Sequence, residues 1–67
     1  MSTWYTGTCG SWRKPESMER LAGTYSRKDI FARAQELANK RNEVVTVHEE
    51  TGGVNGLRYK FYKVAPQ

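Results

Sequence analysis

The sequence predicts an α+β domain, in which an antiparallel sheet of three or four strands carries one amphipathic helix on one face. Residues 26–42 have the apolar spacing of a helical stripe. Residues 57–64 alternate between apolar and polar side chains, and residues 43–50 are rich in valine, as expected for strands. The length of 67 residues is that of one small domain, so we expect residues 1–67 to share a single core.

The N-terminal region is expected to supply one or two strands. Residues 3–9 are rich in Thr, Trp and Tyr, which favour a pleated, half-buried surface. Residues 13–25 fit a short helix, with Pro15 at its first position and a C-terminal Gly23, but they also fit a second strand over 18–24. We favour the strand, because it pairs the open edge of the first strand, whereas a short isolated helix is marginal.

In the strand interpretation, residues 13–17 form the turn between the first two strands. Leu21 and Tyr25 would then face the core.

The helix has start and stop signals at both ends. Ser26 is a suitable N-cap, and Asp29 three residues later completes a pair that resembles a capping box. Tyr25 and Ile30 occupy the two positions of a hydrophobic staple. At the other end, Asn42 tolerates the left-handed conformation that ends many helices. These signals agree, so the sequence predicts a helix over residues 26–42.

The two C-terminal strands are expected to form a hairpin. We favour a five-residue loop, residues 52–56, over a tight Asn55-Gly56 turn, because the tight turn pairs the glycines at 52–53 with the best part of the last strand. The resulting register pairs the following residues: Val47 with Phe61, Glu49 with Tyr59, Val45 with Lys63, Glu50 with Arg58, His48 with Lys60, Thr46 with Tyr62 and Val44 with Val64. Residues 65–67 are expected to be a frayed tail.

This register predicts most of the core. Leu57, Tyr59 and Phe61 would face the helix, and Arg58, Lys60 and Tyr62 would face away from it. The predicted core residues are Ile30, Phe31, Ala34, Leu37, Ala38, Val45, Val47, Leu57, Tyr59 and Phe61.

The composition excludes several classes of protein. The single cysteine, Cys9, excludes an internal disulfide and a multi-cysteine zinc site, which fits a reducing, cytoplasmic environment. No apolar run has the length of a membrane helix or signal peptide, so we expect a soluble protein without membrane partners. Met1 suggests a complete small gene product. The net charge of +4 favours anionic partners without naming one.

The potential catalytic residues do not form a catalytic constellation. His48 is flanked by Glu49, which a strand directs to the opposite face, and Glu50 shares its face without a third ligand or a nucleophile. Cys9 has no neighbour in sequence that would clearly activate a thiol. We therefore expect no catalytic, cofactor-binding or metal-binding residues, and no enzymatic activity.

The last strand is the best candidate for a binding surface. Arg58 and Lys60 share a face with Tyr62, and Lys63 follows, which is the composition of surfaces that bind single-stranded nucleic acid. The simpler interpretation is that these cations guard a sheet edge against aggregation and that Glu50 neutralises Arg58.

The order of elements also resembles that of small phage-encoded α+β proteins. The residues that carry this resemblance are WYTG near the N-terminus, the helix entry TYSRKDIFARAQELA and the strands VVTVHEE and LRYKFYKV. Some proteins of this kind bind and inhibit host enzymes or defence complexes. The resemblance therefore implies a stoichiometric binding protein whose partner is a host protein.

Two functions follow from these observations. The first is a non-enzymatic module that modulates a host protein, with Trp12 or Tyr62 as aromatic anchors beside arginines. The alternative is a small basic protein that binds single-stranded nucleic acid through Arg58, Lys60, Tyr62 and Lys63. An unpaired sheet edge would also allow a homodimer.

Overall fold

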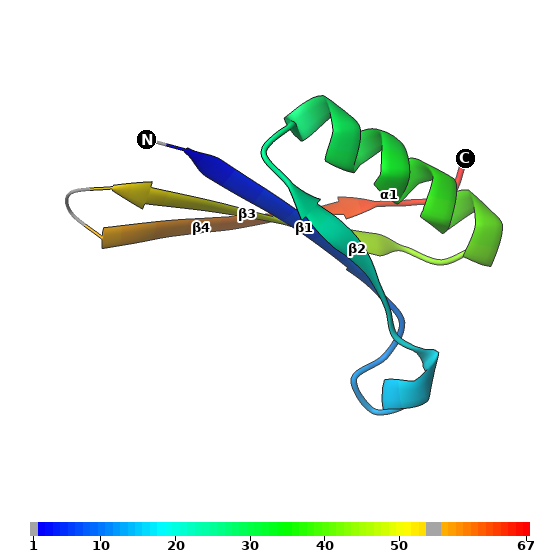
Figure 1. Ribbon diagram of the computed structural model, residues 1–67. Coiled ribbons are helices and arrows are strands. Elements are labelled where there is room, and N and C mark those ends of the chain that lie inside the picture. Colours follow the sequence, from blue (N-terminus) through cyan, green and yellow to red (C-terminus); the bar gives the residue numbers. More distant parts are fainter. Residues whose placement is uncertain (1, 54–55) are drawn as a thin grey trace.

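In the computed structural model, one helix packs on one face of a four-stranded antiparallel sheet (Figure 1). The structure describes residues 2–53 and 56–67. The elements in chain order are β1 (Thr3–Cys9), the short 3₁₀ helix η1 (Pro15–Ser17), β2 (Glu19–Thr24), α1 (Arg27–Arg41), β3 (Val45–Gly53) and β4 (Gly56–Val64). The strand order is β2-β1-β3-β4, so β1 and β3 are central and β2 and β4 are the edges. The predicted α+β class is therefore confirmed.

The helix ends are those that the sequence predicts. The Ser26 side chain caps α1 by accepting a hydrogen bond from the Asp29 backbone N–H, over 3.2 Å. Asn42 ends the helix in the left-handed region, with φ 53°, which brings the Glu43 N–H to 3.2 Å from the Ala38 carbonyl oxygen. Local chemistry is sufficient to fix these ends.

Residues 13–25 contain the strand that we favoured, preceded by a single 3₁₀ turn. Leu21 packs against the core as expected. Tyr25 does not, because the β1–β2 register shifts between Tyr5 and Gly7 and the extra residue on β2 reverses the direction of the side chains that follow. Tyr25 is 67% exposed and lies against Trp4, with ring centroids 4.7 Å apart, so its predicted core position is wrong.

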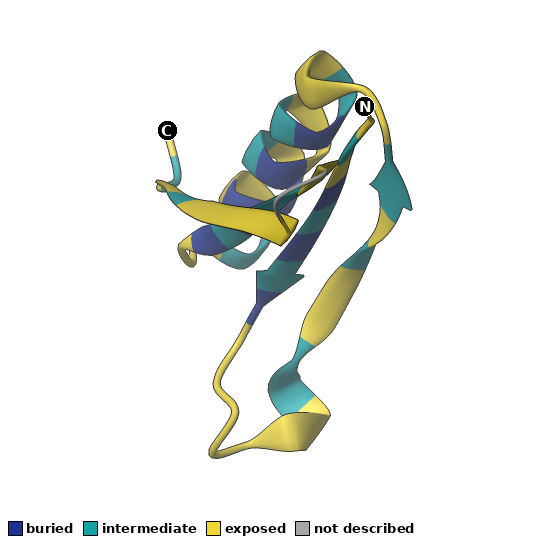
Figure 2. Ribbon diagram, turned by 90° about the vertical axis from the view of Figure 1, so that its left-hand side faces the viewer, coloured by how far each residue is buried: buried dark blue, intermediate teal, exposed yellow. Residues whose placement is uncertain are grey.

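The core lies between α1 and the two central strands (Figure 2). Its side chains come from one face of the helix and from alternate positions of the strands, and its buried members are Tyr5, Cys9, Ile30, Ala34, Leu37, Ala38, Val45 and Val47. Leu21, Phe31, Tyr62 and Val64 are partly buried around them. Tyr5, Cys9, Tyr62 and Val64 were absent from the predicted core.

The predicted register of the last hairpin is wrong by one residue. Val47 pairs with Tyr62 instead of Phe61, and Glu50 pairs with Tyr59 instead of Arg58. The expected five-residue loop is also wrong, because β3 continues to Gly53, which pairs with Gly56; residues 54–55 of that loop lie outside the described residues.

The one-residue shift exchanges the two faces of β4. Leu57, Tyr59 and Phe61, predicted for the core, are 67%, 50% and 58% exposed on the face without the helix. The predicted register would have placed Lys63 against Val45 in the core. The observed one places Val64 there, which avoids burying a lysine charge.

Candidate binding surface

The face of the sheet away from α1 has a polar centre. Its central strands present short polar side chains such as Thr6, Thr8 and Thr46, as expected for a sheet face that meets water. His48 lies among them, with its Nε2 atom 2.9 Å from the Thr8 hydroxyl and its Nδ1 atom hydrogen-bonded to the Tyr59 hydroxyl. Both ring nitrogens are therefore occupied, and the network joins β1, β3 and β4.

Strand β4 departs from this polar pattern. Leu57, Tyr59 and Phe61 lie in a row on the same face, and Trp4 on β1 is 37% exposed. The Tyr59 and Phe61 rings are neighbours, with centroids 6.3 Å apart, and the Lys63 ammonium lies 5.8 Å from the Phe61 ring. We call Leu57, Tyr59 and Phe61 the apolar row of β4.

The opposite side of β4 carries Arg58, Lys60 and Tyr62. Tyr62 is half-buried: its ring meets Phe31 edge to face, and the Arg27 guanidinium lies 5.0 Å from its centroid. Its hydroxyl donates a hydrogen bond to Glu49 Oε2 over 3.2 Å. Glu49 also pairs with Arg27 at 3.0 Å, so this carboxylate links the start of α1 to the sheet.

Residues 50–53 and 56–60 lie beyond the start of the helix, since Arg27 in its first turn contacts Glu49 and Tyr62. Figure 1 shows the β3–β4 hairpin projecting past α1. Arg58 and Lys60 on the helix side are exposed as a result, whereas Leu57, Tyr59 and Phe61 are exposed because their face carries no helix.

The structure separates the predicted binding residues. Arg58 and Lys60 lie together on the helix side of β4, with Tyr62 held in packing contacts beside them, whereas Lys63 is on the other face. Trp12 is 76% exposed and follows Cys9, the last residue of β1. Cys9 pairs with Val45, which pairs with Val64, so Trp12 lies at the opposite end of the sheet from Arg58. The predicted group is therefore not one surface.

Sequence reasoning missed the apolar row as a binding surface, although it identified the alternation that produces the row. Its three apolar residues were assigned to the core because the predicted register, which satisfied apolar pairing and one charge pair together, placed Val47 opposite Phe61. The signal that could have placed them outside was Lys63, which the chosen register had to bury.

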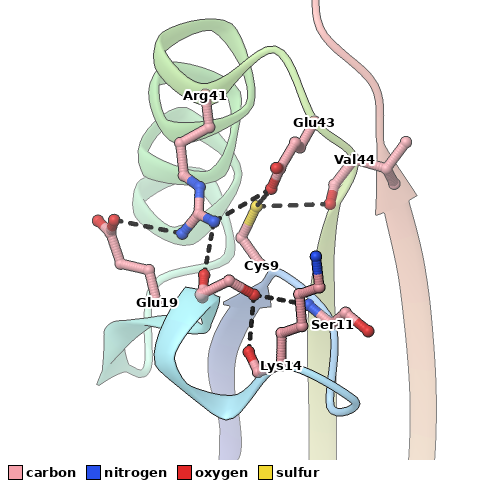
Figure 3. Close-up of polar contacts among 8 residues, drawn as sticks. Cys9, Ser11, Lys14, Glu19, Arg41, Glu43 and Val44 are labelled. Carbon is pink, nitrogen blue, oxygen red and sulfur yellow. Dashed lines mark hydrogen bonds and ion pairs between the residues drawn. The ribbon is translucent and has the colours of Figure 1, made fainter.

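Cys9 belongs to a structural cluster at the other end of the sheet (Figure 3). It is 2% exposed, and its thiol donates to Glu43 Oε2 over 3.2 Å. Burial, followed by the hydrogen bond to Glu43, raises the pKa of this thiol above its ordinary value. Arg41 pairs with Glu43 at 3.2 Å and with Glu19, the first residue of β2, at 3.6 Å, which ties the end of α1 to the start of β2.

A shallow groove of about 220 Å³ between α1 and β2 is lined by Glu19, Leu21, Arg33, Glu36, Leu37 and Lys40. Its mixed charges select no ligand class. Within residues 2–53 and 56–67, no group of three or more His, Cys, Asp or Glu side chains could hold a metal ion. In the same part of the chain, no helix is long and apolar enough to cross a membrane.

Comparisons with protein families, curated proteins and solved structures found no match.

Proposed function

We propose that this chain is a non-enzymatic protein-binding module that engages its partner through the apolar row of β4 and the adjoining part of the helix-free face. The observation that carries the proposal is the exposure of Leu57, Tyr59 and Phe61, at 67%, 50% and 58%. Tyrosine and phenylalanine are enriched at protein interfaces, and apolar side chains exposed together favour association.

The contrast within one sheet face supports this proposal. The threonines of β1 and β3 show that this face can be polar. Trp4 on β1 is 37% exposed there, but among the described strands only β4 presents three exposed apolar side chains in a row. Local departures from a polar surface pattern are expected where function requires them. The non-enzymatic assignment is supported by the occupied nitrogens of His48 and the burial of Cys9. That the partner is a host protein of a phage stays a prediction from the resemblance.

The test compares capture of a partner by the parent and by a Tyr59→Ser/Phe61→Ser variant, in nuclease-treated lysate of the source organism. Ala22→Ser is the matched control, because Ala22 is exposed on the opposite edge strand. We expect one discrete protein to be captured by the parent and the control and lost with the double variant. Equal capture by a folded double variant would refute the proposal.

Binding of single-stranded nucleic acid is the second candidate function, and the geometry assigns base stacking to different residues from those predicted. Tyr62 is held by Phe31 and Arg27, so the rings that can stack on bases are Tyr59 and Phe61, with Lys63 beside them. Affinity would then fall with salt at a slope of about −0.7 per phosphate contact, and Phe61→Ala would weaken binding by about 1–3 kcal/mol without changing that slope. Binding unaffected by Phe61→Ala and Lys63→Ala would eliminate this candidate.

A further inference from the structure

The outer edge of β4 is long and regular. β3 is its only strand partner within the described residues, and the β3–β4 register runs from Val45–Val64 to Gly53–Gly56 without a shift. The other edge strand, β2, has six residues and a register shift against β1, a device that discourages pairing. Alternate residues of β4 therefore direct backbone N–H and C=O groups outward, where a further strand can bond to them.

The side chains beside this edge form two different rows. Arg58 and Lys60 stand on the helix side, and the apolar row of β4 stands on the other. No ion pair engages Arg58, Lys60 or Lys63 among residues 2–53 and 56–67. The carboxylate opposite Lys60 belongs to Glu49, which is already bound by Arg27 and by the Tyr62 hydroxyl.

These cations disfavour pairing with a second copy of the chain in the registers that centre on them. An antiparallel β4–β4 pair centred on Arg58, Tyr59 or Lys60 places a cation of one copy opposite a cation of the other, and like charges directly opposite destabilise a sheet. A strand with acidic side chains at the same positions gains attraction instead.

We propose that the outer edge of β4 accepts an extended segment of the partner protein as a fifth strand of the four-stranded sheet. The segment alternates Asp or Glu, which face Arg58 and Lys60, with apolar residues, which face Tyr59 and Phe61. This inference rests on the proposed function and names the chemistry of the partner. Backbone hydrogen bonds to the edge of β4 supply the affinity, and the cationic row and the apolar row of β4 determine which peptide sequence binds.

The probe is a synthetic peptide of about eight residues that alternates Glu with Val, titrated onto the full chain by calorimetry and NMR. A peptide with Lys in place of Glu is the charge control. We expect the Glu peptide to bind about tenfold or more tightly than the Lys peptide, and an Arg58→Glu/Lys60→Glu variant to reverse this preference. Failure of the Glu peptide to bind, or an unreversed preference in the folded variant, would overturn the proposal.

Backbone N-methylation separates strand addition from docking on the sheet face. In a β-strand, alternate N–H groups point to opposite edges, so N-methylating one alternate set should abolish binding of the Glu peptide and the other set should leave it intact. Amide exchange along β4 should slow at every second residue in the complex. Strand addition would be refuted if the two methylated sets had equal effects, or if amide exchange along β4 were unchanged in the complex. If Tyr59→Ser/Phe61→Ser still abolished partner capture in that case, the proposed function would remain supported. If self-association of the chain protected the same β4 amides in the absence of peptide, the strand that adds to β4 would be a second copy of the chain and not a segment of the partner protein.

Discussion

Neighbouring residues of β4 provide a direct test of which side of the strand stabilises the fold. Tyr62 is half-buried against Phe31, whereas Phe61 is 58% exposed on the other face. Truncating a fully buried aromatic residue to Ala costs about 3–5 kcal/mol, so about half of that, ~2 kcal/mol, applies to Tyr62. The lost edge-to-face contact adds about 0.5–1.5 kcal/mol.

We therefore expect Tyr62→Ala to lower the free energy of unfolding by about 2.5–3.5 kcal/mol and Phe61→Ala to lower it by less than about 1 kcal/mol. For a domain of this size, these values correspond to melting temperatures lower by about 10–28 °C and by less than about 8 °C. Tyr62→Phe removes only the hydrogen bond to Glu49 and should cost about 1 kcal/mol or less.

The assay is urea unfolding of each variant followed by circular dichroism, with thermal unfolding as a second measurement. The register places Tyr62 and Phe61 on opposite faces, so the order of the two alanine variants is the decisive result. If Phe61→Ala is the more destabilising substitution, β4 presents its other face to the helix and the proposed binding surface is lost.

Three further predictions concern the core, the hairpin and the buried thiol. Leu37→Ala should cost about 2–5 kcal/mol in urea unfolding, because Leu37 is 5% exposed; an unchanged unfolding midpoint would place it outside the core. Gly56→Ala should lower the free energy of unfolding by about 1–2 kcal/mol, because Gly56 has φ 108°, which is unfavourable for alanine. Gly52→Ala is the control and should have little effect, because Gly52 has open space around it and no positive φ; equal effects of the two substitutions would contradict the left-handed conformation of Gly56. Cys9 should react slowly with iodoacetamide at neutral pH and rapidly in urea, and fast reaction of the folded chain would contradict its burial. Because the pKa of the Cys9 thiol is raised in the folded state, the protonated thiol should contribute its full stabilisation below the ordinary value of 9.0, and this stabilisation should be lost as pH rises through the folded pKa. The Cys9→Ala variant should lack this pH dependence.

The sequence alone determined the helix, because the signals that start and stop a helix are local. Ser26 caps the first turn and Asn42 adopts the left-handed conformation whatever the helix packs against. The spacing of Ile30, Ala34 and Leu37 likewise defines the buried face before any partner is known. The strand over residues 19–24 was also within reach, since the first strand needed a partner along its edge.

Only the tertiary structure decided which face of β4 enters the core. The alternation of Leu57, Tyr59 and Phe61 is visible in the sequence, but a shift of one residue in the hairpin reverses its meaning. The predicted register, chosen because it satisfied apolar pairing and the Glu50–Arg58 charge pair, therefore buried the apolar row. The helix, however, covers only the end of the sheet where Tyr62 and Val64 lie, and residues 57–60 project beyond it. At the covered end, the choice is between burying Phe61 with Lys63 and burying Tyr62 with Val64, and the cost of burying a lysine charge selects the second pair.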